Sequence, residues 1–103
     1  MRDLALDTRQ MIRVVVLSAR ARKDLRSCPG HIVRKFMAWV GSVQAVGLEA
    51  IRQVPGYHDE PLKGEWSGHR SIRLSAAYRA VYRVRKDGAL ELAFVESVNK
   101  HVY

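Results

Sequence analysis

The sequence has little cysteine, no long apolar run and few acidic residues, and each shortage excludes a class of protein. Cys28 is the single cysteine in 103 residues, which excludes an internal disulfide framework and a multi-cysteine zinc site. No apolar run approaches the length that a bilayer-spanning helix needs. Residues 1–10 mix acidic and basic side chains without an apolar stretch, so no secretory signal is predicted. We therefore expect a cytoplasmic protein that does not bind membranes.

The shortage of acidic residues leaves a strongly basic chain. Asp and Glu total 10 against 18 Lys and Arg, which gives a net charge of +8 with His neutral. Apolar residues make up 48% of the chain, enough to build a core, so the charge does not indicate disorder. Such an excess on a small surface predicts a polyanionic partner, with nucleic acid as the leading candidate. A merely soluble basic protein remains the alternative.

The length fits one domain. Residues 1–11 show no clear periodicity and are predicted to be a flexible lead-in to a single domain over residues 12–103. The first half predicts one strand followed by two or three helices, because a β-branched run precedes apolar residues at helical spacing. The expected ranges are a strand over 12–17, helices over 19–26 and 31–46, and a short helix over 48–54. Ser18 is the expected N-cap of the first helix.

The second half predicts three strands after a polar loop. The loop covers residues 57–69, and the strands cover 70–75, 78–85 and 90–98. A two-residue turn at Asp87-Gly88 would place arginines on the same face as Leu92 and Phe94, at a cost of several kcal/mol if that face is buried. We therefore expect a three-residue turn over 86–88 that places Tyr82 opposite Leu92. The predicted fold class is α+β, with the N-terminal strand and two to three helices packed on one face of an antiparallel sheet.

This arrangement leaves the other face of the sheet rich in arginine. Arg79, Arg83 and Arg85 alternate along one strand, and Arg73 has the same orientation on its own strand. If the last strand continues beyond Val98, its alternation brings further polar side chains to this face. They are Asn99, His101 and Tyr103.

Residues 12–103 resemble the RelE/ParE superfamily of toxin–antitoxin toxins, and within it most closely the RelE-type messenger-RNA interferases. The resemblance lies in the order and spacing of four motifs. These are Pro61-Leu62-Lys63-Gly64, Arg70-Ser71-Ile72-Arg73-Leu74, Tyr78-Arg79-Ala80-Val81-Tyr82 and the tail over 96–103. It implies a RelE-like fold, a ribosome-dependent endoribonuclease that cuts messenger RNA, and a cognate antitoxin that holds it inactive. The chain departs from RelE at Ser71, where RelE has a lysine, and at His101, where RelE has an arginine.

The residues that the resemblance aligns suit metal-independent RNA cleavage. That reaction deprotonates the 2′-hydroxyl, stabilises charge on phosphorus and protonates the 5′-oxygen. His101 is predicted to be the general acid or base, because a histidine has a reference pKa of about 6.5. Arg79 is predicted to clamp the phosphate, and Arg73 to add charge or act as the second proton-transfer partner. Tyr103 would stack on a base or orient the nucleophile.

Other basic residues are predicted to contact RNA rather than to react. They are Lys63, Arg70, Arg83, Arg85 and Lys100. No partner can be identified for His58 or His69, and no His, Cys or carboxylate spacing predicts a metal, so no metal or cofactor is expected. Two alternatives to the nuclease stay open. One is a ParE-like inhibitor of DNA gyrase on the same fold, and the other is an RNA-binding or ribosome-binding protein without catalysis.

Overall fold

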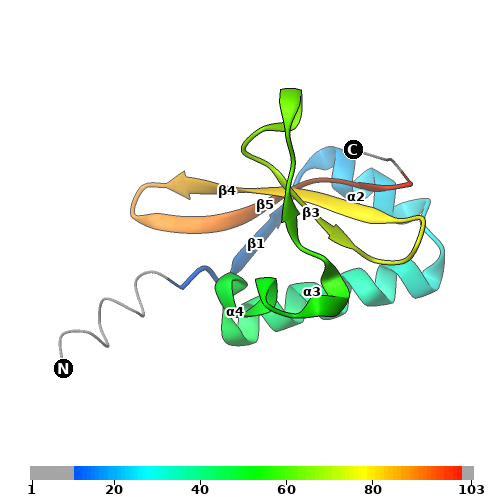
Figure 1. The fold of residues 1–103 in the computed structure, drawn as a ribbon, viewed down its shortest axis with the longest axis horizontal. Helices are drawn as coiled ribbons and strands as arrows, with labels where there is room; N and C mark the ends of the chain where they lie inside the picture. Colours follow the sequence, from blue (N-terminus) through cyan, green and yellow to red (C-terminus); the bar gives the residue numbers. More distant parts are fainter. Residues whose placement is uncertain (1–10, 101–103) are drawn as a thin grey trace.

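The structure, a computed structural model, describes residues 11–100 and contains three α-helices packed on a five-stranded sheet (Figure 1). The helices are α2 (Ala19–Arg26), α3 (Gly30–Val46) and α4 (Leu48–Arg52). The strands are β1 (Val14–Leu17), β2 (Glu60–Pro61), β3 (Arg70–Arg73), β4 (Arg79–Asp87) and β5 (Leu90–Asn99). Their order across the sheet is β1-β5-β4-β3-β2. The predicted α+β class is confirmed.

Local sequence features define where the helices begin and end. The Ser18 hydroxyl accepts a hydrogen bond from the Ala21 amide at 2.9 Å, which confirms the predicted N-cap of α2. Gly47 separates α3 from α4 with a φ of 93°, a conformation that favours glycine. The next amide, that of Leu48, donates to the Ile12 carbonyl at 2.8 Å and so ties this junction to the start of β1.

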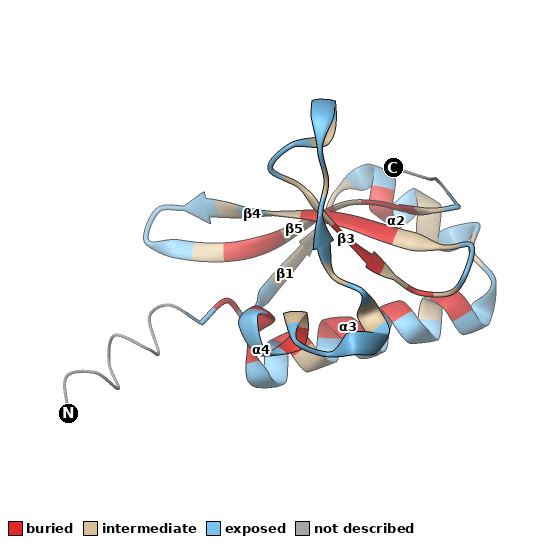
Figure 2. Ribbon diagram, viewed as in Figure 1, coloured by how far each residue is buried: buried red, intermediate tan, exposed pale blue. Residues whose placement is uncertain are grey.

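Helices α3 and α4 cover one face of the sheet, α2 lies along the edge of β5 beyond β1, and all three contribute to one core. The buried side of α3 follows the predicted spacing (Figure 2). It consists of Ile32, Phe36, Trp39, Val40 and Val43. The Trp39 ring lies between those of Phe36 and Tyr82, with centroid distances of 5.9 and 5.5 Å. This aromatic cluster fixes β4 against α3, and within residues 11–100 no α-helix covers the opposite face of the sheet.

The predicted turn and register between β4 and β5 are wrong. Asp87 pairs with Leu90 across a two-residue turn, Gly88-Ala89, so Arg83 lies opposite Phe94. Leu92 and Phe94 therefore lie on the arginine side, and the smaller Ala93 and Val95 enter the core. The expected burial cost does not arise because the arginines stay partly exposed. Their guanidinium groups lie over the Phe94 ring, at 5.3 Å for Arg83 and 4.2 Å for Arg85.

A β-bulge then inverts the alternation of β5. Tyr82 pairs with Val95 but Val81 pairs with Ser97, so Glu96 is the extra residue. Beyond it Val98 packs in the core, and Asn99 lies opposite Arg79 on the open face. The prediction that Asn99 shares a face with the arginines is confirmed, although the bulge rather than simple alternation places it there.

The sheet is mixed rather than antiparallel, because β1 pairs in parallel with β5. Three helices and three strands separate these two elements in the chain, so no hairpin forces them to be antiparallel. The predicted loop over 57–69 contains the two-residue strand β2, which pairs with β3, and the short helix η2 (Gly64–Trp66). The segment around η2 stands out from the rest of the molecule (Figure 1). Within residues 11–100 no helix is long and apolar enough to span a membrane.

Candidate nucleic-acid interface

The face of the sheet opposite the helices carries Arg73, Arg79, Arg83 and Arg85, which we call the arginine face. Strand pairing aligns these residues in rows: Arg73 lies beside Arg79 and then Asn99, while Arg83 lies beside Phe94. All four arginines are partly exposed. The predicted arginine-rich face is therefore present.

Arg73 and Arg79 form a pair of like charges directly opposite each other on adjacent strands. Neither guanidinium has an ion-pair partner within residues 11–100. The Nε of Arg73 and the Nη1 of Arg79 are buried and have no hydrogen-bond partner in that part of the chain. Like charges in such a position destabilise a sheet, and unpaired buried donors add to the cost. An anion between the two strands would satisfy both groups, so this pair suits a phosphate.

Arg83 belongs to a separate cluster at the bulge. Its Nε donates to the Glu96 Oε2 at 2.9 Å, and the same oxygen lies 3.3 Å from the Nε2 of His69. The His69 ring meets Trp66 edge-on at 5.3 Å. His69 thus has a partner that the sequence did not identify, since the bulge that turns Glu96 toward it leaves no mark in the strand pattern. Burial opposes ionisation of Glu96, but hydrogen bonds from Arg83 and His69 outweigh it and lower the pKa.

This lowered pKa makes the cluster a pH-dependent contributor to stability. Glu96→Gln should reduce the free energy of unfolding by about 1 kcal/mol at pH 7, because the carboxylate is only partly exposed and is paired twice. A group whose pKa is lower in the folded state stabilises above its unfolded pKa of about 4.3 and loses that effect as pH falls through the folded value. Urea unfolding of the two proteins should therefore differ at pH 7, and the difference should shrink as the pH falls below about 4.3.

Glu49→Gln is the control for this measurement, because Glu49 is exposed in the first turn of α4. It should change stability little across this pH range. A Glu96→Gln protein as stable as the wild type at pH 7 would show that the cluster contributes nothing to the fold.

The charged groups of Arg85 and Lys100 remain accessible to a ligand. Within the described residues Arg85 has no ion pair, and its guanidinium lies over Phe94. The Lys100 ammonium lies 5.9 Å from the centre of the Tyr78 ring, near the other end of the sheet. Lys63 is exposed just before η2. These three predicted RNA contacts are therefore accessible.

Arg70 is placed differently from the other predicted contacts. It pairs with Tyr82 across β3 and β4, so it lies on the helix-covered face, and its Nε donates to Asp59. The Tyr82 hydroxyl donates to the same carboxylate at 2.6 Å, and Arg52 donates to that hydroxyl at 3.2 Å. Burial and then the Asp59 bond raise the pKa of Tyr82. Arg70 is thus committed to an internal network, and its role in RNA binding stays a prediction.

The structure describes two of the four predicted catalytic residues. Arg73 and Arg79 are brought together, whereas His101 and Tyr103 lie outside the described residues. The described part of β5 ends with Asn99 beside Arg79. No group of three or more His, Cys, Asp or Glu side chains within residues 11–100 could hold a metal ion.

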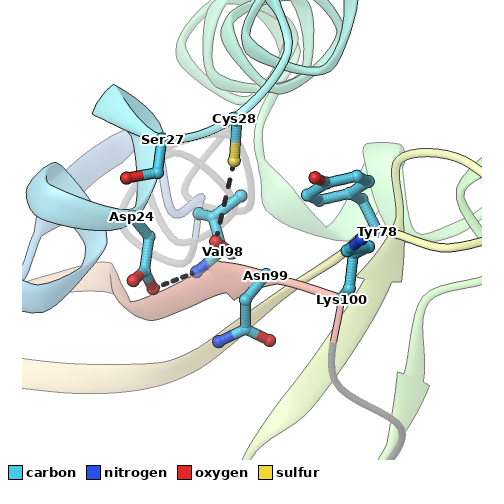
Figure 3. Close-up of a pocket in the computed structure, with 7 residues that line it drawn as sticks. All are labelled: Asp24, Ser27, Cys28, Tyr78, Val98, Asn99 and Lys100. Atoms are coloured by element: carbon cyan, nitrogen blue, oxygen red, sulfur yellow. Dashed lines mark hydrogen bonds between the residues drawn. The ribbon is translucent and has the colours of Figure 1, made fainter.

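A pocket of about 180 Å³ lies at this end of the sheet, on the side that packs against the core (Figure 3). We call it the end-of-sheet pocket. It is lined by Asp24, Ser27, Cys28, Tyr78, Val98, Asn99 and Lys100. Asp24 and Cys28 are held toward β5, since the Val98 amide donates to Asp24 at 2.9 Å and the Cys28 thiol contacts the Val98 carbonyl at 3.8 Å. The sequence did not predict this pocket, because it forms between the end of α2 and two distant strands.

Comparison with known proteins gives matches only among solved structures; no family model and no curated protein matches the sequence. A YoeB/ParE toxin from Agrobacterium tumefaciens aligns with a TM-score of 0.64 and 23% identity, over 86% of this chain and 99% of that one. The toxin–antitoxin complex RelBE2 from Mycobacterium tuberculosis gives 0.61 and 22%, over 85% and 96%. YafQ from Escherichia coli gives 0.60 and 16%, over 84% and 91%.

These matches show that the chain has the fold of RelE/ParE-superfamily toxins. They cover between 91% and 99% of each matched chain. The resemblance seen in the sequence motifs is thereby supported by the three-dimensional arrangement.

Proposed function

We propose that this protein is the toxin of a type II toxin–antitoxin system and acts as a ribosome-dependent endoribonuclease on messenger RNA in the cytoplasm. The observation that carries the proposal is the Arg73–Arg79 pair, two like charges whose buried donors have no partner within residues 11–100, on a face that no helix of that part of the chain covers. The fold it shares with known toxins and the net charge of +8 support the same conclusion.

In this mechanism Arg73 and Arg79 bind the scissile phosphate and stabilise the charge that develops on phosphorus. Guanidinium groups suit this task because they are always charged and offer several donors in one plane. His101 exchanges the proton of the 2′-hydroxyl or the 5′-oxygen, and Tyr103 contacts a base or orients the nucleophile. The chemistry requires no metal or cofactor. The sparse set of proton-transfer groups explains why the ribosome would have to orient the RNA.

The experiment that tests the function uses purified protein and translating ribosomes. New messenger-RNA 5′ ends should appear on ribosome-bound messages, while free RNA at physiological salt is cut poorly. Efficient cleavage of naked RNA would contradict ribosome dependence. Intact messages together with blocked DNA supercoiling would support the gyrase-inhibitor alternative instead.

Arg85 is expected to contribute binding rather than chemistry, through contact with ribosomal RNA. Its guanidinium lies over Phe94 and has no carboxylate partner within the described chain. Arg85→Gln should weaken ribosome binding and lower the magnitude of the salt slope by about one unit if one phosphate contact is lost. The slope is measured from binding constants at several salt concentrations. An unchanged slope would make Arg85 a solvated residue.

The proposal includes a cognate antitoxin as the partner that silences the protein. An acidic or amphipathic segment that covers the arginine face would block RNA and neutralise its charge. One of the matched structures is itself a toxin–antitoxin complex, which supports this expectation.

A further inference from the structure

Strand β5 loses its neighbouring strand on one side before it ends. Its parallel pairing with β1 stops at Val95, the partner of Leu17, whereas its pairing with β4 continues to Asn99. On the β1 side, residues 96–99 therefore have no strand to pair with in the described part of the chain. Unpaired backbone groups at the edge of a strand cost free energy when they are buried, and they allow the end of the strand to open.

Side chains from α2 and its flanking residues take the place of the missing strand. The Ser18 hydroxyl, which also caps α2, donates to the Glu96 carbonyl at 2.7 Å. The Val98 amide donates to the Asp24 carboxylate at 2.9 Å, and the Cys28 thiol donates to the Val98 carbonyl at 3.8 Å (Figure 3). The free edge of β5 is thus bonded by side chains near both ends of the helix.

Asp24 makes the strongest of these contacts. It lies three residues after Ala21, so both share the side of α2 that faces β5, and the small, fully buried Ala21 lets the helix approach closely. The Asp24 side chain is only 19% exposed, and a charged acceptor roughly doubles the strength of a hydrogen bond. Its ion pair with Arg20 at 3.8 Å contributes less, because the Arg20 side chain is 64% exposed.

Cys28 contributes a weaker contact to the same residue of β5. Burial and, after it, the nearby Asp24 carboxylate raise the pKa of Cys28. The thiol therefore keeps its proton and remains a donor to the Val98 carbonyl. Because a thiol is a weak donor, the bond from the Val98 amide to Asp24 holds this end of the strand in place.

The segment that Asp24 holds leads directly to the proposed reacting groups. Val98 packs in the core, and Asn99 lies opposite Arg79 on the arginine face. His101 follows Asn99 by two residues in the sequence. Pairing with β4 on one side and the bond to Asp24 on the other together set the direction in which the chain leaves the sheet.

We propose that Asp24 is a positioning residue whose bond to the Val98 amide holds the end of β5 so that the residues after Asn99, His101 among them, lie beside Arg79. The inference rests on the proposed function, because RNA cleavage is the reaction that needs His101 next to a bound phosphate. In this role Asp24 contacts no RNA and exchanges no proton. A displacement of about 1 Å in a reacting group can cost about 10²-fold in rate, so one distant hydrogen bond has a large expected effect.

Phosphate binding tests the position of His101 without requiring cleavage. Protein labelled with carbon-13 and nitrogen-15 is titrated with inorganic phosphate, and the Arg79 amide and the His101 imidazole are followed by NMR. Both should shift in the wild type. In Asp24→Ala the Arg79 amide should shift as before, while the response of the imidazole is lost. The Val98 amide of this variant should exchange with solvent about tenfold faster, because it has lost a charged acceptor.

Cleavage distinguishes positioning from a merely structural contact. Asp24→Ala should slow single-turnover cleavage of ribosome-bound messenger RNA by about 10²-fold and leave ribosome affinity unchanged. Asp24→Asn should restore most of the rate, since its amide oxygen can still accept from Val98. Arg20→Gln is the matched control, because it removes the ion-pair partner of Asp24 and keeps the bond to Val98. It should cleave at the wild-type rate.

Three results would each overturn the positioning role. Phosphate shifts the Arg79 amide but not the His101 imidazole in the wild type; a folded Asp24→Ala protein keeps either the imidazole shift or the wild-type rate; or Asp24→Asn is as slow as Asp24→Ala. The first result needs no variant, so it decides the matter even if Asp24→Ala does not fold.

Failure of this role and failure of the nuclease proposal give different results. If the wild type and Asp24→Ala cleave RNA equally well, the positioning role alone is lost. If phosphate shifts the His101 imidazole only while Asp24 is present, but the wild type cuts no RNA on ribosomes, the nuclease proposal alone is lost.

Discussion

Arg79→Gln should slow cleavage of ribosome-bound messenger RNA by about 10²–10³-fold without destabilising the fold. The loss of rate follows from removing one fixed charge from the developing phosphorane, which is comparable to removing one donor from an oxyanion hole. The fold should tolerate the change because Arg79 lies directly opposite Arg73 and gains no ion pair in residues 11–100. Relief of a like-charge cross-strand pair is worth about 0.2–1 kcal/mol, so stability should rise or stay constant.

The measurement combines single-turnover cleavage with urea unfolding of the same preparations. Arg34→Gln is the control, since Arg34 is exposed on α3, on the far side of the sheet, and loses the same charge. It should leave both quantities nearly unchanged. If Arg79→Gln lowers stability and leaves cleavage intact, the arginine pair is a structural feature and not a phosphate clamp.

His101→Gln should slow cleavage by about 10²–10⁴-fold, the range expected when one proton-transfer group is lost. Glutamine keeps a hydrogen-bonding side chain but cannot carry a proton near neutral pH. This variant therefore removes proton transfer while keeping a side chain that can still contact RNA. Ribosome affinity and antitoxin binding should stay close to those of the wild type. Stability should change by less than about 1 kcal/mol.

The comparison with Arg79→Gln separates the two proposed roles. Loss of the arginine should weaken RNA contact as well as rate, whereas loss of the histidine should affect the chemical step alone. Single-turnover rates and equilibrium binding to ribosomes measure these quantities independently. If His101→Gln cleaves ribosome-bound RNA at the wild-type rate, the proton carrier must be another residue.

Much of the fold could be predicted from the sequence because its determinants are local. The apolar spacing of α3 and the cap at Ser18 depend on residues within a few turns of one another, and both were confirmed. The alternation of arginines along β4 likewise predicted the arginine face, because side chains in a strand point to alternate sides. These features can be predicted without knowing which elements pack against them.

The predictions that proved wrong concern strand register and pairing, which depend on contacts between distant segments. The β4–β5 register was predicted on the assumption that large apolar residues face the helices, but Trp39 and Tyr82 already fill that space, and Ala93 and Val95 pack there instead. Phe94 is consequently on the open face, where two arginines lie over it. Core volume, which no single strand encodes, decided this register.

The sequence by itself determined a basic α+β protein with an arginine-rich strand, because charge and periodicity are properties of the chain alone. Tertiary structure decided which groups meet. The bulge at Glu96 brings its carboxylate to His69 and Arg83, and the same shift places Asn99 beside Arg79. The end-of-sheet pocket also exists only after α2 docks against β5. One extra residue in a strand reverses the direction of every later side chain, and nothing in a local pattern records where a strand accommodates it.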